Sequence, residues 1–151
     1  MTKHATLLIP LFEAFSWFDA GLQVLLRDAG WTAVSRPQTM VLIAVGLGIE
    51  RPADIARALG ITRQSASATI AEMVEEGLLE LEADPDDGRA KRVRVSAQGE
   101  QRTRDSRRAM AVLTEELTRR IGKANVRKLS EALTPAWGPA VARVEDIGGR
   151  D

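Results

Sequence analysis

The side chains in this sequence that could do chemistry are mostly charged, and they are unevenly distributed. Residues 72–87 include eight acidic side chains and no basic one. Residues 88–108 include eight basic side chains against two acidic ones. The formal net charge is zero, yet a neutral chain with one strongly basic stretch can still present a surface that attracts phosphate. The distribution of charge therefore favours binding to phosphate groups.

Residues suited to catalysis or metal binding are scarce. The 151 residues include no cysteine and one histidine, His4. Without cysteine there is no disulfide, thiolate metal site or thiol-based sensor, and a single imidazole suits zinc or iron poorly. The sequence also has no nucleophile beside a base, no clustered carboxylate pair and no glycine loop that could cradle a phosphate. We therefore expect no enzyme activity, no metal and no cofactor.

The length and composition fit one folded domain that spans residues 1–151. A domain has roughly 150 residues, and 44% hydrophobic with 28% charged residues exclude disorder as the main state. The apolar block at residues 5–12 is interrupted by Pro10 and is soon followed by Glu13 and Asp19. It fits neither a signal peptide nor a membrane span, so we expect a soluble cytoplasmic protein.

A β-hairpin is predicted where the acidic and basic stretches meet. Apolar residues alternate with acidic ones over residues 79–82 and with basic ones over residues 92–96, which is the period of a strand. The Asp-rich segment 84–88 between them predicts a turn. The hairpin would therefore carry three charged residues at its tip, namely Asp87, Arg89 and Lys91.

Two short helices are predicted before the hairpin. Pro52 suits the first turn of one helix, and Gly60 provides its left-handed stop. Thr62 caps the next, which ends at Gly77. The buried stripe of this second helix is expected to comprise Ala66, Ile70 and Met73. With a further helix predicted after a capping box at Ser35, this order of elements is that of a winged helix-turn-helix.

Longer helices are predicted on both sides of this core. Residues 8–29 repeat apolar side chains at helical spacing, with Trp17 off the main stripe. After Gly122 a second apolar stripe is formed by Val126, Leu129, Leu133, Trp137, Val141 and Val144. Together these helices carry more apolar surface than a small core can cover, and large exposed apolar patches are rare in monomers. We therefore expect them to pair two copies of the chain, with Trp17 at the contact.

Four segments resemble the multiple antibiotic resistance regulator (MarR) family of bacterial transcription factors. They read ADIARALGITRQSAS (53–67), EGLL (76–79), DPDDGR (84–89) and VRVSAQG (93–99). The flanking helices also match in number and placement, so the resemblance covers nearly the whole chain. It implies a mainly α fold with a small β-hairpin wing: a DNA-binding lobe over residues 35–96, flanked by dimerisation helices over residues 5–30 and 97–147.

The resemblance and the helical spacing together indicate which residues contact DNA. A recognition helix enters the major groove by its N-terminal part, where Gln64 could pair with adenine and Arg63 with guanine or phosphate. The resemblance implies that Arg89 enters the minor groove and that Asp87 holds it by an ion pair. This sequence departs from the family at Ala68 and Gly88, where a basic residue is common, so we expect more shape readout than direct readout. The expected DNA-binding residues are Thr62, Arg63, Gln64, Ser65, Ser67, Ala68, Asp87, Arg89 and Lys91.

The resemblance further implies a repressor that binds a pseudo-palindromic operator as a homodimer and is released by a small lipophilic or phenolic ligand. The ligand would bind between the DNA-binding lobe and the dimer helices. Residues on or beside the first two helices are its expected contacts, although a plain core position is the alternative for each: Phe15, Phe18, Trp31, Arg36 and Met40.

Two alternatives remain open from the sequence. The short side chains on the recognition helix also suit a winged-helix module that docks a protein without specific DNA binding. The four arginines that follow the hairpin could touch the DNA backbone, pair with acids of another subunit or simply face solvent. These arginines are Arg102, Arg104, Arg107 and Arg108.

Overall fold

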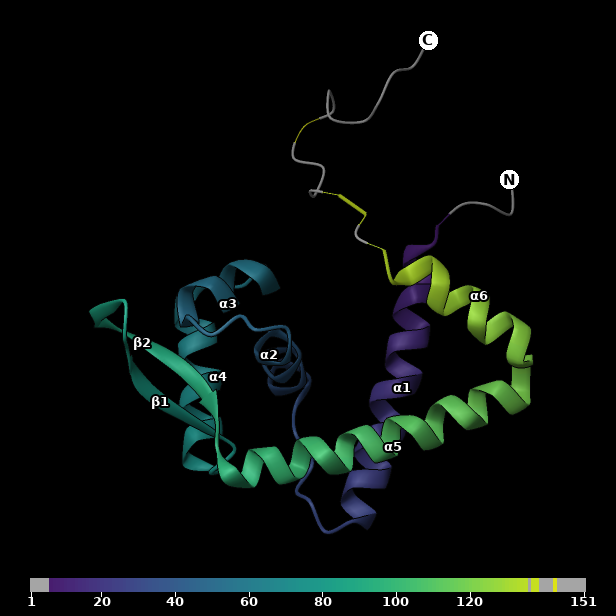
Figure 1. Cartoon of the computed structure of the whole chain (residues 1–151), viewed down its shortest axis with the longest axis horizontal. Coiled ribbons are helices and arrows are strands. Elements are labelled where there is room, and N and C mark those ends of the chain that lie inside the picture. The colour runs from purple at the N-terminus through teal and green to yellow at the C-terminus, as the bar shows by residue number, and fades with distance from the viewer. Residues whose placement is uncertain (1–5, 136, 139–142, 144–151) are drawn as a thin grey trace. The chain divides into compact units, whose positions relative to one another are not determined.

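The computed structural model describes residues 6–135, 137, 138 and 143, and within them the fold is mainly helical with one β-hairpin (Figure 1). The helices are α1 (Leu8–Asp28), α2 (Arg36–Gly46), α3 (Pro52–Leu59), α4 (Arg63–Glu75), α5 (Ala97–Ile121) and α6 (Lys123–Leu133). The strands are β1 (Leu79–Asp84) and β2 (Asp87–Val95). The predicted fold class is confirmed, while His4, Val141 and Val144 lie outside the described residues. The chain divides into two compact units, residues 1–113 and residues 114–151.

Local capping determines where α2, α3 and α4 begin and end. Ser35 and Gln38 form the predicted capping box, in which the backbone N–H of each donates to the side chain of the other. Helix α3 ends at Gly60, whose φ of 64° is left-handed. Helix α4 begins after Thr62, whose Oγ1 accepts a hydrogen bond from Ser65 N at 3.1 Å. The turn between α3 and α4 is therefore the predicted short one.

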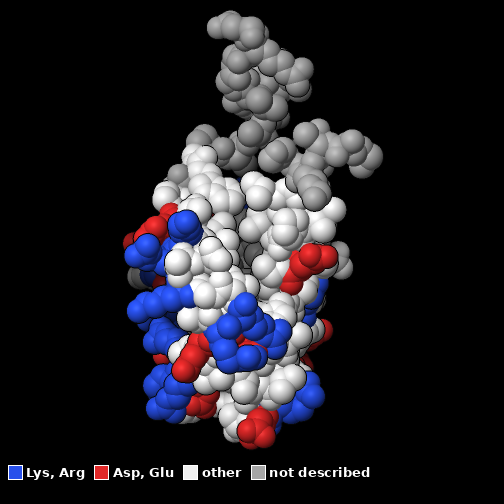
Figure 2. All heavy atoms as spheres, turned by 90° about the vertical axis from the view of Figure 1, so that its right-hand side faces the viewer, with Lys and Arg blue, Asp and Glu red and all other residues white. Residues whose placement is uncertain are grey.

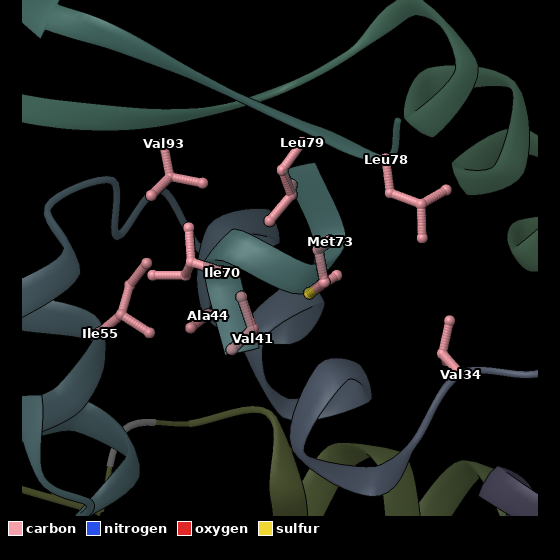
Figure 3. Close-up of a cluster of buried hydrophobic side chains, with 9 residues drawn as sticks. All are labelled: Val34, Val41, Ala44, Ile55, Ile70, Met73, Leu78, Leu79 and Val93. Carbon is pink, nitrogen blue, oxygen red and sulfur yellow. The ribbon is translucent and has the colours of Figure 1, made fainter. Parts of the chain in front are cut away.

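The core of the first unit lies between α2, α3, α4 and the hairpin (Figure 3). Ile55 of α3 and Ile70 and Met73 of α4 are each no more than 2% exposed. Burying one such side chain contributes about 1.5–3 kcal/mol relative to leaving it exposed. The other members of the cluster are Val34, Val41, Ala44, Leu78, Leu79 and Val93. The predicted stripe of α4 is thus buried, which turns the opposite side of this helix outward.

The strands β1 and β2 pair antiparallel in the register that the alternation predicts. Leu79 lies opposite Val95, and Val93 points into the core. The turn is shorter than the predicted segment 84–88, because β2 already begins at Asp87. The charged tip therefore belongs to a strand whose base is held by the core.

Gly99 allows α5 to start directly against the hairpin. A Cβ at this position would lie 2.1 Å from the carbonyl oxygen of Leu78, so no side chain fits without a backbone movement. Ser96 Oγ accepts a hydrogen bond from Gly99 N at 2.9 Å and donates one to the carbonyl of Gly77. The N-terminal end of α5 is therefore fastened to the junction between α4 and β1.

Helix α1 is long and apolar enough to cross a membrane, judged by length and composition alone. It is one such helix among the described residues, which is weak support for a membrane protein. Its contacts are those of a helix packed into the first unit. Leu26 is 1% exposed, Thr39 Oγ1 donates to Asp19 at 3.4 Å, and a Cβ on Gly21 would meet Leu113 Cδ2 at 2.5 Å. These contacts place α1 against α2 and the first part of α5.

The terminal helices leave many apolar side chains exposed within the single chain. Helix α6 has no buried residue. Trp17 is half-buried and packs edge-on against Phe18, with ring centroids 4.9 Å apart, so its role as a dimer contact stays a prediction. The exposed large apolar side chains are Leu8, Ile9, Phe12 and Val24 in α1, Val112 and Ile121 in α5, and Leu129 and Leu133 in α6.

Candidate nucleic-acid interface

The outward side of α4 carries the residues that the sequence assigns to the major groove. In its first turns five predicted side chains are exposed, while Ala66 between them is 0% exposed. The exposed ones are Arg63, Gln64, Ser65, Ser67 and Ala68. The predicted division between buried and exposed residues of this helix is therefore confirmed, and their contact with DNA stays a prediction.

The side chains at the start of α4 differ in whether they form hydrogen bonds within the chain. Thr62 Oγ1 donates to Ser65 Oγ at 2.9 Å, so these two hydroxyls hold each other. Arg63 and Gln64 are exposed, and within the described part of the chain their side chains make no hydrogen bond or ion pair. Their donors and acceptors are available to a ligand without breaking an internal contact.

The tip of the hairpin presents Asp87, Arg89 and Lys91, all of them exposed. Asp87 Oδ1 accepts a hydrogen bond from the backbone N–H of Arg89 at 3.1 Å. The ion pair between these two side chains that the resemblance implies is not formed among the described residues, because the carboxylate is turned to the backbone. Asp87 therefore shapes the strand that carries Arg89 and leaves its guanidinium extended into solvent.

Sequence reasoning missed a charged anchor that holds the wing beside its turn. Arg51 Nε donates to Asp84 Oδ2 at 2.7 Å, and the Asp84 side chain is only 1% exposed. Glu50 contributes a second attachment: its carbonyl accepts from Val93 N at 2.7 Å, and its carboxylate pairs with Arg92. The segment before α3 thus holds the wing through contacts that join residues far apart in sequence.

The same segment also forms ion pairs with basic residues of β2. Arg94 pairs with Glu50 at 3.2 Å and lies 3.8 Å from a carboxylate oxygen of Glu82. Together with the Arg92 pair, this means that two of the predicted basic residues are neutralised inside the lobe. Among the basic residues of β2, Arg89 and Lys91 near the tip remain exposed for an external partner.

The pKa of Asp84 is held below its ordinary value of 3.8. The largest cause is the Asp86 backbone N–H, which donates to Asp84 Oδ1 at 3.0 Å; burial opposes it, and the Arg51 guanidinium adds to it. A carboxyl whose pKa is lower in the folded state than in the unfolded state stabilises the fold at any pH above its pKa in the unfolded state. That stability is lost as the pH falls through the folded value.

Asp84→Asn should therefore lower the free energy of unfolding at neutral pH and flatten its decline below about pH 4. Urea unfolding followed at a series of pH values measures both effects. The control Asp54→Asn removes an exposed carboxylate of the same lobe and should leave stability close to that of the wild type. An Asp84→Asn variant with the wild-type stability and pH profile would show that the anchor does not hold the wing.

The four arginines after the hairpin do not form one surface. Arg102 is 4% exposed, which is incompatible with a contact to DNA. Arg104 donates to Gln101 at 2.7 Å, and Arg108 pairs with Asp105 at 3.2 Å. Arg107 is exposed and lines the cavity described below.

In the second unit, basic side chains are likewise balanced by acidic ones. Glu116 pairs with Arg119 at 2.7 Å and with Arg120 at 2.6 Å. These two guanidinium groups lower the pKa of Glu116 to about 2. Figure 2 shows basic and acidic side chains interleaved on one face of the molecule, without a continuous basic surface.

A cavity of about 600 Å³ lies within the first unit, between α1, α2, β2 and the first part of α5. Phe15 and Phe18, two of the five predicted ligand contacts, line it. The other three do not. Trp31 instead donates to Asp105 at 3.0 Å beside the core, and Met40 is half-buried elsewhere on α2.

Arg36, the fifth predicted ligand contact, lies over aromatic rings of α1. Its guanidinium carbon lies 5.5 Å from the ring centroid of Phe12 and 5.6 Å from that of Phe15, and its Nε is 3.7 Å from Asp19. Sequence reasoning also missed polar residues of the cavity on α1, α2 and α5. They are Asp19, Gln23, Thr39, Glu100, Arg102, Thr103, Ser106 and Arg107. Their participation could not be read from helical periodicity, because it depends on how the three helices meet.

Comparison with known proteins bears on the fold of the chain. Residues 34–90 match the family model described as MarR family. No curated protein sequence matches the chain. The match covers the helix-turn-helix and reaches the tip of the wing.

Solved structures show the same fold over most of the chain. Wild-type MarR from E. coli in its apo form has a TM-score of 0.68 at 18% identity, covering 87% of this chain and 96% of that one. Transcriptional regulator Tm0710 from Thermotoga maritima has 0.60 at 22%, covering 82% and 85%. NadR in complex with 4-hydroxyphenylacetate has 0.66 at 18%, covering 88% and 93%.

The family match and the similarity in fold coincide over the helix-turn-helix and most of the wing. Residues 34–90 match the MarR family model, and the winged helix-turn-helix with its terminal helices has the same fold as MarR from E. coli.

Proposed function

We propose that this protein regulates transcription by binding a pseudo-palindromic operator as a homodimer, and that it represses by occupying the promoter. The observation that carries the proposal is that the start of α4 and the tip of the wing are both exposed on the same lobe. The exposed first turns of α4 offer Arg63 and Gln64, and the wing tip offers Arg89, with a common core behind both. The first surface suits a major groove and the second an adjacent minor groove.

The residues of α4 divide into readers of bases and residues that position the helix. The amide group of Gln64 can make a bidentate pair with adenine, in which its NH₂ donates to N7 and its oxygen accepts from the N6 amino group. Arg63 can reach guanine or phosphate. The hydroxyls of Ser65 and Ser67 suit phosphate oxygens. Because Ala68 has no hydrogen-bonding group and can offer only an apolar contact, more of the specificity falls on DNA shape, which Arg89 would sense in the minor groove.

A homodimer follows from the apolar surface of the terminal helices. Helices α1 and α6 carry exposed side chains such as Phe12, Val24 and Leu133 that a second copy could cover. Two recognition helices related by a two-fold axis can meet successive major grooves about 34 Å apart. An operator with two inverted half-sites is the matching DNA.

A small lipophilic or phenolic ligand is the proposed effector, and the cavity in the first unit is its proposed site. The cavity volume of about 600 Å³ lies in the range usual for small-molecule sites, and Phe15 and Phe18 supply aromatic walls. The similar structure of NadR holds 4-hydroxyphenylacetate, which is a small phenolic molecule. Binding that favours one spacing of the two lobes would shift the dimer away from the operator.

A gel-shift assay with mixed genomic fragments at increasing salt tests DNA binding directly. Because binding releases counterions from phosphates, affinity should fall steeply, by roughly 10³ or more between 50 and 200 mM salt for six or more phosphate contacts. Retention of a subset of fragments at high salt would identify operators. Absence of any salt-sensitive shift would refute DNA binding and leave the winged-helix module that docks a protein.

Gln64→Ala should relax the base preference at one position of each half-site more than it lowers binding to unrelated DNA. Competition between operator variants substituted at single positions measures this preference. Gln101→Ala, an exposed glutamine on α5, serves as the control and should leave the preference unchanged. An equal loss of binding to every sequence would make Gln64 a positioning contact only.

A further inference from the structure

The last turn of α4 carries acidic side chains where a helix is stabilised by basic ones. Glu72 and Glu75 lie in this turn, Glu76 is the C-cap residue, and the turn has no basic residue. The C-terminal end of a helix bears a partial negative charge, and acids three or four positions apart repel each other. Glu72 stands three positions before Glu75 and four before Glu76. These acids therefore lower the stability of the helix that contains them.

Contacts within the described part of the chain compensate for one of these three acids. The carboxylate of Glu76 accepts hydrogen bonds from Gln38 Nε2 at 3.1 and 3.3 Å. Glu72 and Glu75 are exposed, and their carboxylates form no hydrogen bond or ion pair with another described residue. Proteins break local rules of stability mostly at functional positions. An uncompensated pair of acids in this turn therefore points to a role outside the fold.

Glu75 lies on the side of α4 that carries the proposed contacts to DNA. Gln64, Ala68, Ala71 and Glu75 are all exposed and are spaced by four, three and four positions. This spacing aligns them along one face of a helix, and the buried stripe of α4 lies on the other side. Glu72 follows Ala68 by four positions and flanks the same face. The outward side of the recognition helix thus ends in two carboxylates.

The charge of the proposed DNA-binding surface consequently changes sign along α4. Arg63 at the start of the helix and Arg89 at the wing tip are exposed cations, and the N-terminal end of a helix adds partial positive charge. Glu72 and Glu75 bring negative charge to the opposite end. A cation beside a phosphate raises affinity for DNA of any sequence, and a carboxylate beside a phosphate lowers it. The two ends of α4 therefore differ in how they interact with the DNA backbone.

We propose that Glu72 and Glu75 determine specificity by repelling the phosphate backbone whenever α4 is not seated in its operator register. The proposal rests on the DNA binding proposed above and adds two residues to it. Helix α4 has 13 residues and is about 20 Å long, whereas the major groove is about 12 Å wide. With its first turns on the bases and the wing in the minor groove, the helix directs its last turn out of the groove toward solvent. A shifted or tilted docking brings that turn against a phosphate strand.

This repulsion weakens non-specific complexes more than the operator complex. Non-specific binding comes almost entirely from phosphate contacts, whereas operator binding also gains from contacts with bases. A genome offers a large excess of competing non-specific sites, so the ratio of the two affinities decides how much protein occupies the operator. Glu72 and Glu75 raise that ratio without contacting a base.

Glu72→Gln and Glu75→Gln, made singly and together in the full chain, test this role. Fluorescence anisotropy measures binding to an operator recovered by selection from random DNA and to a scrambled duplex of the same length. At about 50 mM salt each substitution should tighten binding to the scrambled duplex about fivefold, because the dimer carries each carboxylate twice. Operator affinity should change by less than about twofold, since base contacts and register are unaltered. The effect should shrink at about 200 mM salt, because exposed charges are then screened.

A matched control and thermal unfolding separate this role from a general effect of charge. Glu115→Gln removes an exposed carboxylate from α5 in the second unit and should leave both affinities unchanged. Glu75→Gln should melt no lower than the wild type, because it removes an acid from the negative end of a helix. Glu75→Lys should tighten binding to the scrambled duplex further than Glu75→Gln does, because it replaces repulsion by attraction.

Unchanged binding to the scrambled duplex in the double variant, while the wild type binds its operator, would overturn the proposal and leave the proposed function intact. A loss of operator affinity confined to one cytosine of each half-site would also overturn it, because the carboxylate would then read a base by accepting from N4. Failure of the wild type and every variant to bind either duplex would refute the proposed function and this role with it.

Discussion

Leu133→Glu should convert the protein to a monomer and abolish tight operator binding, although the residue does not face DNA. Helix α6 has no buried residue within the single chain, and Leu133 is 44% exposed there beside Leu129. In a dimer interface the new carboxylate would be buried without a partner, which costs several kcal/mol of association, about 3–5 kcal/mol in comparable cases. A single lobe holds only one half-site, so the loss of the dimer removes most of the affinity.

Sedimentation equilibrium at micromolar concentration and gel shifts on the operator measure the two effects of Leu133→Glu. Leu47→Glu is the matched control: Leu47 is 75% exposed, but it follows α2 and belongs to neither terminal helix. The control should remain a dimer and bind the operator as the wild type does. A wild-type protein that sediments as a monomer under these conditions would rule out the proposed interface.

Arg89→Ala should weaken operator binding by roughly 1–3 kcal/mol and leave the dimer and its melting temperature unchanged. Arg89 is exposed at the wing tip, and Asp87 contacts its backbone N–H rather than its guanidinium. Truncation therefore removes a contact to DNA without breaking an internal ion pair.

Fluorescence anisotropy with labelled operator, together with thermal unfolding, measures the effect of Arg89→Ala. Arg57→Ala removes a cation from the same lobe, where Arg57 pairs with Asp54 on α3 at 2.8 Å, and controls for the loss of one positive charge. An Arg89→Ala protein with unchanged operator affinity would exclude the wing tip from the interface.

The parts of the fold that depend on local sequence were predictable. Helix starts follow from side chains that satisfy nearby backbone groups, as at Ser35 and Thr62, and the buried side of α4 follows from the spacing of Ala66, Ile70 and Met73. The hairpin follows from its period of two. In each case the interacting residues lie within a few positions of one another.

The parts that depend on tertiary contacts were not predictable. Arg102 belongs to a basic run in the sequence, yet the meeting of α1, α2 and α5 buries it. Arg51 and Asp84 are far apart in the chain, so no spacing rule connects them. Trp31 and Arg36 were assigned to the cavity from their place beside the first helices, but neither lines it: Trp31 donates to Asp105, and Arg36 lies over the ring of Phe15.

The central claim is that two copies of the chain bind one DNA duplex, each through α4 and the wing. Hydroxyl-radical footprinting on an operator selected from random DNA tests this claim most directly. The account predicts two equivalent protected half-sites with centres about 34 Å, or roughly 10 base pairs, apart, each with protection of an adjacent minor groove that disappears in Arg89→Ala. Failure of the selection to enrich any sequence, or protection of one half-site without a symmetric partner, would contradict it.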